Sequence, residues 1–138
     1  MRMPHIFAPG RFTLRPHHVA LWTDAVAGDA NEAARIGGVL PSIALLLCFN
    51  GAGASIDDIM ATLDTKPERV LFGEIELEID RPLRAGLTYS IDTAIVGSEH
   101  KHGRKTGPFD KVTLRYALSE GDRRAATVTQ TWIISRDA

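Results

Sequence analysis

Apolar residues follow two different periods along this chain, the first typical of helices and the second typical of strands. After an extended arm expected over residues 1–12, Val19, Trp22 and Val26 recur at helical spacing. Pro16 suits the first turn of a helix, because its missing N–H would have no partner there. The spacing therefore predicts a short amphipathic helix over residues 16–27.

A second helix is predicted over residues 39–50, where nearly every residue is apolar. It ends at the stop signal Asn50-Gly51-Ala52-Gly53. Because its apolar residues cover all faces, we expect other structure to wrap it. Ser55 is expected to cap a further short helix that ends near Leu63.

Beyond Pro67 the period changes to two, and four alternating segments predict strands with one face in the core. Their inward positions are Leu71, Ile75, Leu77 and Ile79; Tyr89, Ile91, Thr93 and Ile95; Val112, Leu114, Tyr116 and Leu118; and Val128, Gln130, Trp132 and Ile134. Turns or polar connections are expected at residues 81–86, 97–107 and 120–122, so consecutive strands should pair antiparallel. The expected class is α+β, with a curled antiparallel sheet around one buried helix, in a single domain of residues 1–138.

Composition limits the partners and the compartment. The chain is 44% hydrophobic and 24% charged with a net charge of −1, so no long-range field draws it to nucleic acid or to a membrane. The longest apolar run, from Val39 to Phe49, is shorter than the roughly 20 residues that span a bilayer, and a cytoplasmic protein is expected. The single cysteine, Cys48, excludes an internal disulfide and is expected to be a core thiol. No cofactor or metal site is expected.

A polar turn ahead of the apolar helix holds groups suited to acid–base chemistry. Asp29 can act as a base and Asn31 can position water or substrate, although both residues are also common in ordinary turns. Gly37, Gly38 and Val39 open the helix, where backbone N–H groups can stabilise a carbonyl oxygen that gains charge. These residues are the candidate catalytic and substrate-binding site.

Gly28-Asp29-Ala30-Asn31 follows the first predicted helix, and Arg81-Pro82-Leu83 with Ala85-Gly86 follows the first predicted strand. These two segments resemble the MaoC-like hot-dog superfamily of (R)-specific enoyl-CoA hydratases and dehydratases. Phe12-Thr13-Leu14-Arg15 leads towards Ala27-Gly28-Asp29-Ala30-Asn31, which is similar to that family's Gly-Asp-x-Asn-Pro-φ-His stretch, where φ is apolar. Residues 73–86, with Arg81-Pro82-Leu83 and Ala85-Gly86, resemble the strand-turn phrase of the degenerate, non-catalytic N-terminal repeat in double hot-dog members. The resemblance implies the hot-dog fold and an acyl thioester of coenzyme A or of an acyl-carrier protein as ligand.

The chain departs from the family at the catalytic histidine. The family places proline, an apolar residue and histidine where this chain has Glu32, Ala33 and Ala34. In the family, the aspartate and the histidine together hold the water that adds to the double bond. The resemblance implies a hydratase or dehydratase of 2-enoyl or 3-hydroxyacyl thioesters in which another residue replaces the histidine, or its non-catalytic partner subunit. A hot-dog acyl-CoA thioesterase is the alternative.

The connection between the second and third predicted strands is strongly basic. Its cationic groups are His100, Lys101, His102, Arg104 and Lys105. It is expected to be either a solvated hairpin tip or a patch for the phosphates of coenzyme A or of a phosphopantetheine arm. A homodimer, or a heterodimer with a second hot-dog chain, is also expected, because a lone domain of this fold exposes an edge strand.

Overall fold

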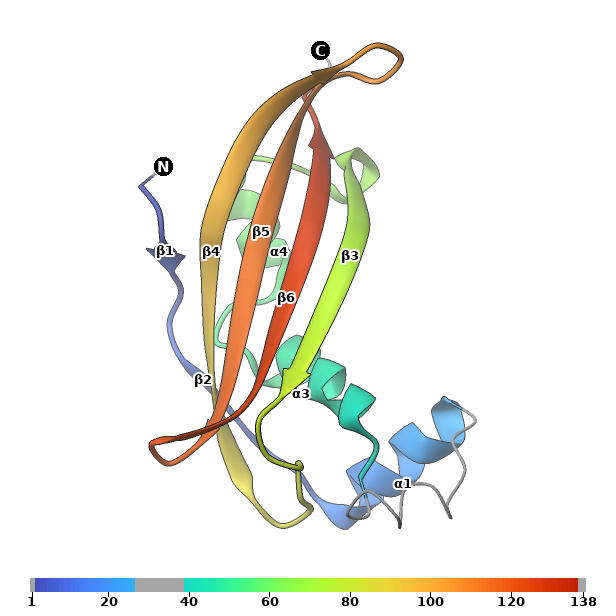
Figure 1. The fold of residues 1–138 in the computed structure, drawn as a ribbon, viewed down its shortest axis with the longest axis vertical. Coiled ribbons are helices and arrows are strands. Elements are labelled where there is room, and N and C mark those ends of the chain that lie inside the picture. Colours follow the sequence, from blue (N-terminus) through green and yellow to red (C-terminus); the bar gives the residue numbers. More distant parts are fainter. Residues whose placement is uncertain (1, 27–38, 137–138) are drawn as a thin grey trace.

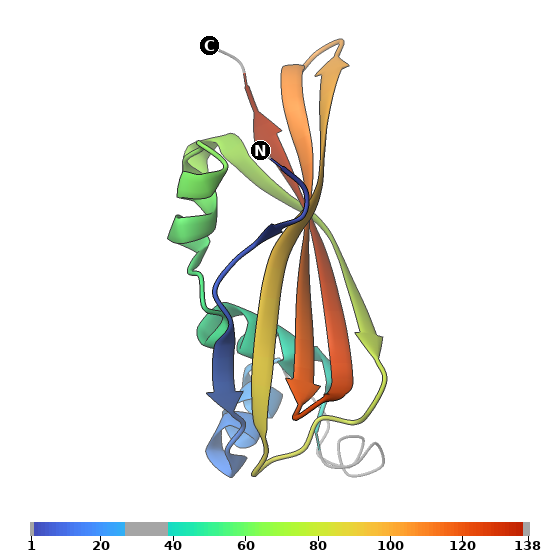
Figure 2. The ribbon, with the colours of Figure 1, turned by 90° about the vertical axis from the view of Figure 1, so that its left-hand side faces the viewer.

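The structure, a computed structural model, describes residues 2–26 and 39–136. Within them, six strands form one antiparallel sheet and the helices gather against one of its faces (Figures 1 and 2). The elements in chain order are β1 (His5–Ile6), β2 (Gly10–Thr13), α1 (Pro16–Ala25), the 3-10 turn η1 (Pro41–Ile43), α3 (Ala44–Gly51), α4 (Ile56–Thr62), the 3-10 turn η2 (Pro67–Arg69), β3 (Val70–Ile79), β4 (Thr88–Gly103), β5 (Gly107–Glu120) and β6 (Arg123–Ser135).

The sheet runs in the order β1-β4-β5-β6-β3, and β2 also pairs with β4. The strands β4, β5 and β6 are joined as consecutive hairpins, and every pairing is antiparallel. The sheet bends around the helices, which lie on its inner face (Figure 2). The α+β class and the curled antiparallel sheet predicted from the sequence are therefore confirmed.

One face of α3 forms the centre of the core. Ala44, Leu47, Cys48 and Gly51 are buried, and their spacing places them on one side of the helix. The helix packs on β2, β4 and β6, whose inner side chains include the fully buried Trp132. The sequence thus correctly placed Cys48 and Trp132 in the core.

The outward face of α3 departs from the prediction that this helix is wrapped on all sides. The Phe49 side chain is 48% exposed, and Leu45 and Leu46 are half-buried. The physical reason is that the sheet reaches only one side of the helix. The helical segment also starts later than residue 39, because Pro41 begins a 3-10 turn that leads into α3.

The helices α1 and α4 match their predictions closely. The α1 helix ends at Ala25, and its half-buried Trp22 donates an indole N–H to Ser42 Oγ at 3.0 Å. Ser55 caps α4 in a reciprocal arrangement with Asp58, in which each side chain bonds the other residue's backbone N–H. No single helix among the described residues is long and apolar enough to cross a membrane. Residues 41–51 and 56–62 reach that length only together, across a 67° bend.

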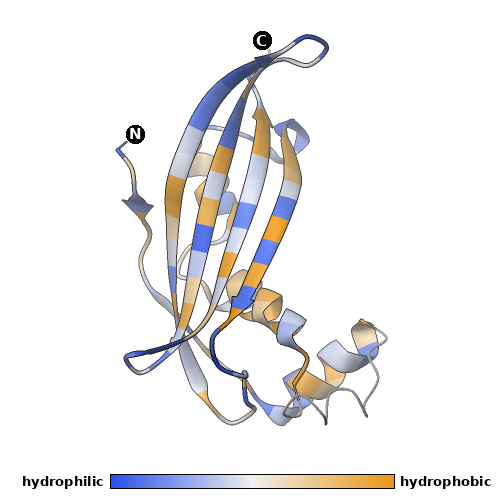
Figure 3. Cartoon of the chain, in the orientation of Figure 1, coloured by the Kyte–Doolittle hydropathy of each residue, from blue (hydrophilic) through white to orange (hydrophobic). Residues whose placement is uncertain are grey.

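The strand β3 forms as predicted, and Ile79 at its end is partly buried against the core, but the apolar side chains along its middle are exposed. Ile75 and Leu77 pair with Gln130 and Val128, which face the helices, yet they are 44% and 36% exposed. Hydrophobic and hydrophilic bands alternate along the strand (Figure 3). The strand lies at the edge of the sheet, beyond β6, where α3 does not cover it. Alternation therefore identified the strand correctly but not the environment of its apolar face. Leu71 was expected to point inward, but a bulge between Phe72 and Ile75 shifts the register, so Phe72 pairs with the buried Trp132 and Leu71 is 68% exposed.

The segment 97–107 is not the polar connection expected from its composition. β4 runs to Gly103 and β5 begins at Gly107, so only residues 104–106 form the tip. The two strands stay paired beyond the core. Neither face of the hairpin is buried there, so polar side chains occur on both faces and apolar and polar residues do not alternate. This long hairpin is the hydrophilic projection at the upper end of the sheet (Figure 3).

Candidate functional site

The predicted catalytic residues Asp29 and Asn31, and the predicted oxyanion glycines Gly37 and Gly38, lie outside the described residues. Their neighbour Val39 is described and is buried in the core just before η1. At this end of the molecule lie the start of α3, the helix α1 and the connection from β3 to β4 (Figure 1). This end is therefore where the described part of the candidate site is to be sought.

The connection between β3 and β4 is held tightly in place. Leu14, the residue before the cap of α1, donates to Leu87 O at 2.9 Å and accepts from Gly86 N at 2.6 Å. Leu83 is buried in the core, and Gly86 has a φ of +93°, a conformation that favours glycine. The connection is thus a fixed part of the surface.

Tyr89 adds a further support beneath this connection. Its ring is buried, and its hydroxyl oxygen accepts a hydrogen bond from the Arg84 backbone N–H at 2.9 Å. Burial raises the pKa of the phenol, and the hydrogen bond from Arg84 opposes part of that rise. The phenol therefore stays neutral in the physiological range and holds the backbone at Arg84.

A hollow of about 470 Å³ opens beside this connection. It is lined by Arg81, Pro82, Arg84, Ala85, Leu87, Glu120 and Arg123. No local motif in the sequence marks this group of arginines. Two of them were assigned to a strand-breaking turn, and the third comes from the start of β6, so only the folded chain brings them together.

The hairpin that carries the basic residues lies at the opposite end of the sheet from α1 and the start of α3 (Figure 1). Two of them already contact carboxylates. His100 Nδ1 lies 2.7 Å from Asp110 Oδ1, and Lys101 Nζ lies 3.6 Å from Glu99 Oε2. Since His100 and Lys101 are neighbours on a strand, their side chains point to opposite faces. The structure therefore places this predicted phosphate patch along one hairpin without gathering it on one face.

Asp110 connects that hairpin to α4. Its Oδ2 accepts from Arg136 Nε at 2.8 Å, and the same guanidinium donates to Leu63 O and Asp64 O at the end of α4. Partial burial works to raise the pKa of Asp110, but hydrogen bonds and charge from His100 and Arg136 outweigh it, so the pKa lies below its usual value. This cluster fastens α4 to the sheet.

The core beneath α3 contains polar atoms without partners. Thr93 Oγ1, Gln130 Oε1 and Trp132 Nε1 are buried and have no hydrogen bond among the described residues. Burial raises the pKa of the Cys48 thiol to about 12, so it is protonated at neutral pH and is a poor nucleophile. Burial also raises the pKa of Tyr116.

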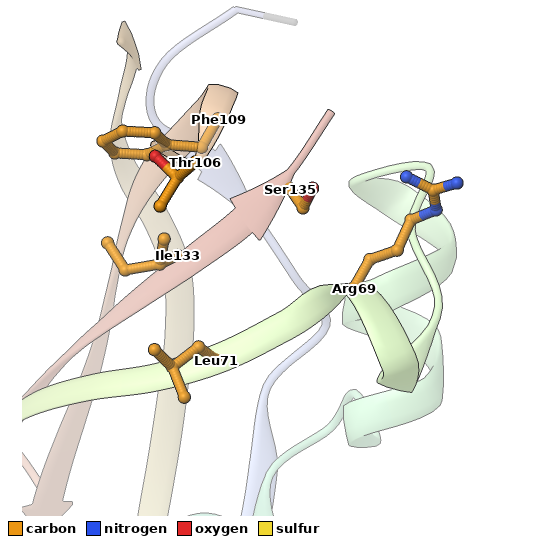
Figure 4. Close-up of a pocket in the computed structure, with 6 residues that line it drawn as sticks. All are labelled: Arg69, Leu71, Thr106, Phe109, Ile133 and Ser135. Atoms are coloured by element: carbon orange, nitrogen blue, oxygen red, sulfur yellow. The ribbon is translucent and has the colours of Figure 1, made fainter. Parts of the chain in front are cut away.

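A second hollow, of about 500 Å³, lies on the outer face of the sheet. Its lining consists of Arg69, Leu71, Thr106, Phe109, Ile133 and Ser135. The apolar side chains gather on one side, while the Arg69 guanidinium points away from them (Figure 4). Among the described residues this lining has two hydroxyl groups, from Thr106 and Ser135, but no acid, imidazole or thiol that could activate them. Across residues 2–26 and 39–136, no group of three His, Cys, Asp or Glu side chains could hold a metal ion.

Comparison with known proteins identifies the architecture. No family model and no curated protein matches the chain. A chain of the ChsH1–ChsH2 complex from Mycobacterium tuberculosis superposes with a TM-score of 0.71 and 17% identity, over 99% of this chain and 84% of that one. A chain of the C-terminally truncated HadBC complex, a 3R-hydroxyacyl-ACP dehydratase from the same organism, superposes with a TM-score of 0.69 and 16% identity. The match covers 94% of this chain and 95% of that one. A MaoC-like dehydratase from Phytophthora capsici superposes with a TM-score of 0.71 and 14% identity, over 96% of this chain and 47% of that one.

The chain has the hot-dog fold of MaoC-like dehydratases. The fold inferred from the sequence resemblance is thus confirmed, with α3 as the helix around which the sheet curls. Identities of 14% to 17% make this a likeness of fold. The finer resemblance to a degenerate N-terminal hot-dog repeat stays a prediction, as do the roles of individual residues.

Proposed function

We propose that this chain is an acyl-thioester-binding hot-dog subunit of the hydratase or dehydratase type, and that it acts together with a second hot-dog chain. The observation that carries the proposal is the open apolar edge at β3. Phe72, Ile75 and Leu77 are between 36% and 49% exposed, although all three pair with buried residues of β6. The inner face of the sheet therefore reaches its edge without cover.

A second hot-dog chain fits this edge in two ways. Within the described residues β3 pairs only with β6, so the backbone groups on its other side are available to a further strand. A strand added there would continue the sheet, and structure that packs on the partner's inner face would then lie beside the exposed apolar side chains. Two similar structures, ChsH1–ChsH2 and HadBC, are complexes of two named chains, which supports this assembly.

The charge on β3 favours a different chain over a second copy. Glu76 and Glu78 pair with Thr129 and Thr127, on the face away from the helices, and Glu74 precedes them at a bulge. All three are exposed, and none forms an ion pair among the described residues. The outer face of the edge strand is therefore a row of carboxylates.

Self-association would set these carboxylates against each other. Residues directly opposite in an antiparallel pair share a face. Two copies with their helices on the same side, paired about Glu76, would set Glu76 opposite Glu76 and Glu74 opposite Glu78. Like charges directly opposite destabilise a strand pair. We therefore propose a partner whose edge strand carries Lys or Arg at the facing positions.

The proposed chemistry places Asp29 as the base that acts on water, with Asn31 orienting the substrate or the water. Backbone N–H groups near Gly37, Gly38 and Val39 would stabilise the thioester oxygen. Because Ala34 stands where the family has histidine, we propose that the partner chain supplies the imidazole.

Hydration of a trans-2-enoyl-CoA tests this proposal. We expect the chain to show no turnover alone and to show turnover when co-purified with a hot-dog chain that has an intact histidine. Asp29→Asn should abolish that turnover without changing the melting temperature, while Asp24→Asn, on the exposed side of α1, should leave it unchanged. Full activity of Asp29→Asn would overturn the assignment. Release of free coenzyme A from a saturated acyl-CoA would establish the thioesterase alternative.

A further inference from the structure

We infer that Arg81, Arg84 and Arg123 form a binding site for a phosphate group. The site would hold the charged end of the carrier to which the acyl group is attached, and in naming a carrier the inference rests on the proposed function. The chemistry recognised is a phosphate ester or pyrophosphate, whether it belongs to coenzyme A or to the phosphopantetheine arm of a carrier protein.

The three arginines share one hollow although they come from two segments. Arg81 and Arg84 lie on the connection from β3 to β4, and Arg123 is the first residue of β6. The hollow measures about 470 Å³, which is ample for a phosphate or a pyrophosphate. Three guanidinium groups around one hollow suit such a ligand, because each can donate two parallel hydrogen bonds to phosphate oxygens.

The charges of this hollow are not balanced within the described residues. Among the described residues of its lining, Glu120 is the one carboxylate, against three guanidinium groups. None of Arg81, Arg84 and Arg123 forms an ion pair with any described residue. Like charges gathered around one hollow repel each other, and an anion with about two negative charges would offset the excess.

The backbone that carries two of these arginines is already ordered. The Arg84 N–H is bonded to the buried Tyr89 hydroxyl, and Leu83 between the two arginines is buried in the core. Binding therefore has to order only the arginine side chains, which lowers the entropic cost of capturing an anion.

The position of the hollow also suits a carrier better than the basic hairpin does. The connection from β3 to β4 lies at the same end of the sheet as η1 and the start of α3, whereas the hairpin tip lies at the other end (Figure 1). His100 and Lys101 of the hairpin already have carboxylate neighbours, Asp110 and Glu99. The arginines are thus the stronger candidate for the phosphate.

Calorimetric titration with coenzyme A, 4′-phosphopantetheine and pantetheine tests the site without any acyl group or turnover. We expect Arg81→Gln/Arg84→Gln/Arg123→Gln to weaken coenzyme A binding by at least about tenfold at low salt, and by less at high salt where contacts are screened. Lys101→Gln/Arg104→Gln/Lys105→Gln removes the same charge at the other end of the sheet and should leave the affinity unchanged. Pantetheine, which has no phosphate, should bind both variants equally.

The same titrations separate the sources of the phosphate. Tighter binding of coenzyme A than of a phosphopantetheinylated carrier protein would indicate the coenzyme, and the reverse order would indicate the carrier arm. Arg123→Gln alone, at an exposed strand start, gives a milder variant should the triple variant lose its fold. Equal affinity of wild type and the arginine variants, or an equal loss in the hairpin variant, would overturn the inference. A chain that binds coenzyme A through these arginines yet never supports hydration would overturn only the proposed function.

Discussion

Gly10 on β2 and Gly51 at the end of α3 lie back to back, so close that a side chain on Gly10 would overlap the carbonyl oxygen of Gly51. Gly53 has the same relationship to the carbonyl of Ala8. These contacts seat the N-terminal strand directly on the end of the core helix. They leave no room for even one methyl group.

Gly10→Ala should therefore destabilise the chain, by about 1–3 kcal/mol in urea unfolding, because backbone must move to accept the new Cβ. Gly97→Ala is the matched control, since a Cβ there would meet no atom within 4 Å. Equal unfolding midpoints for the two variants would contradict the packing described.

Reversing the charge on β3 should change how the chain associates. Glu74→Lys/Glu76→Lys/Glu78→Lys mixed with wild type is expected to form a one-to-one dimer at low salt, while each protein alone stays monomeric, because only the mixture sets opposite charges against each other. Analytical ultracentrifugation measures this. Asp92→Lys/Glu99→Lys/Asp122→Lys, with the same change in charge away from β3, should not pair with wild type. A stable wild-type homodimer at low salt would refute the proposed preference for a different chain.

The cluster around Asp110 should make stability depend on pH in the acidic range. The pKa of Asp110 is lower in the folded chain than its ordinary value. Its contribution to the free energy of unfolding is therefore complete above about pH 4, the usual pKa of aspartate, and is lost as the pH falls through the folded pKa. Asp110→Asn should cost about 1–2 kcal/mol at neutral pH through the weakened bonds to His100 and Arg136. Urea unfolding at a series of pH values checks this. The difference in free energy of unfolding between Asp110→Asn and wild type should disappear below pH 4, and a difference that persists there would contradict this role.

Cys48 should behave as an inert thiol. With its pKa raised to about 12 by burial and with 2% of its surface exposed, it should react with an aromatic disulfide reagent only after unfolding. The measurement is the labelling rate with and without denaturant. Rapid labelling of the native chain at neutral pH would show that α3 does not shield it.

Features of the fold that a local sequence pattern determines could be predicted from the sequence. Features that depend on packing between segments far apart in the sequence could not. Alternation located β3 and the apolar run located α3. Neither pattern indicates whether the rest of the chain packs over every apolar side chain of the element. Leu77 and Phe49 were therefore expected to be buried, and both are exposed. Segment 97–107 was expected to be a loop because a strand that extends past the core needs no alternation. Arg123 joins Arg81 only through the register of β6, which no local motif records.

The acidic row on β3 has a consequence for the chain before it meets a partner. An open edge strand with apolar side chains is a template for uncontrolled addition of further strands. A newly synthesised chain would meet other copies with the same exposed edge. Glu74, Glu76 and Glu78 interrupt that template at every second residue, so stacking of identical copies accumulates repulsion with each chain added. The residues that would select the proposed partner would thus also hinder fibril formation by the newly made chain.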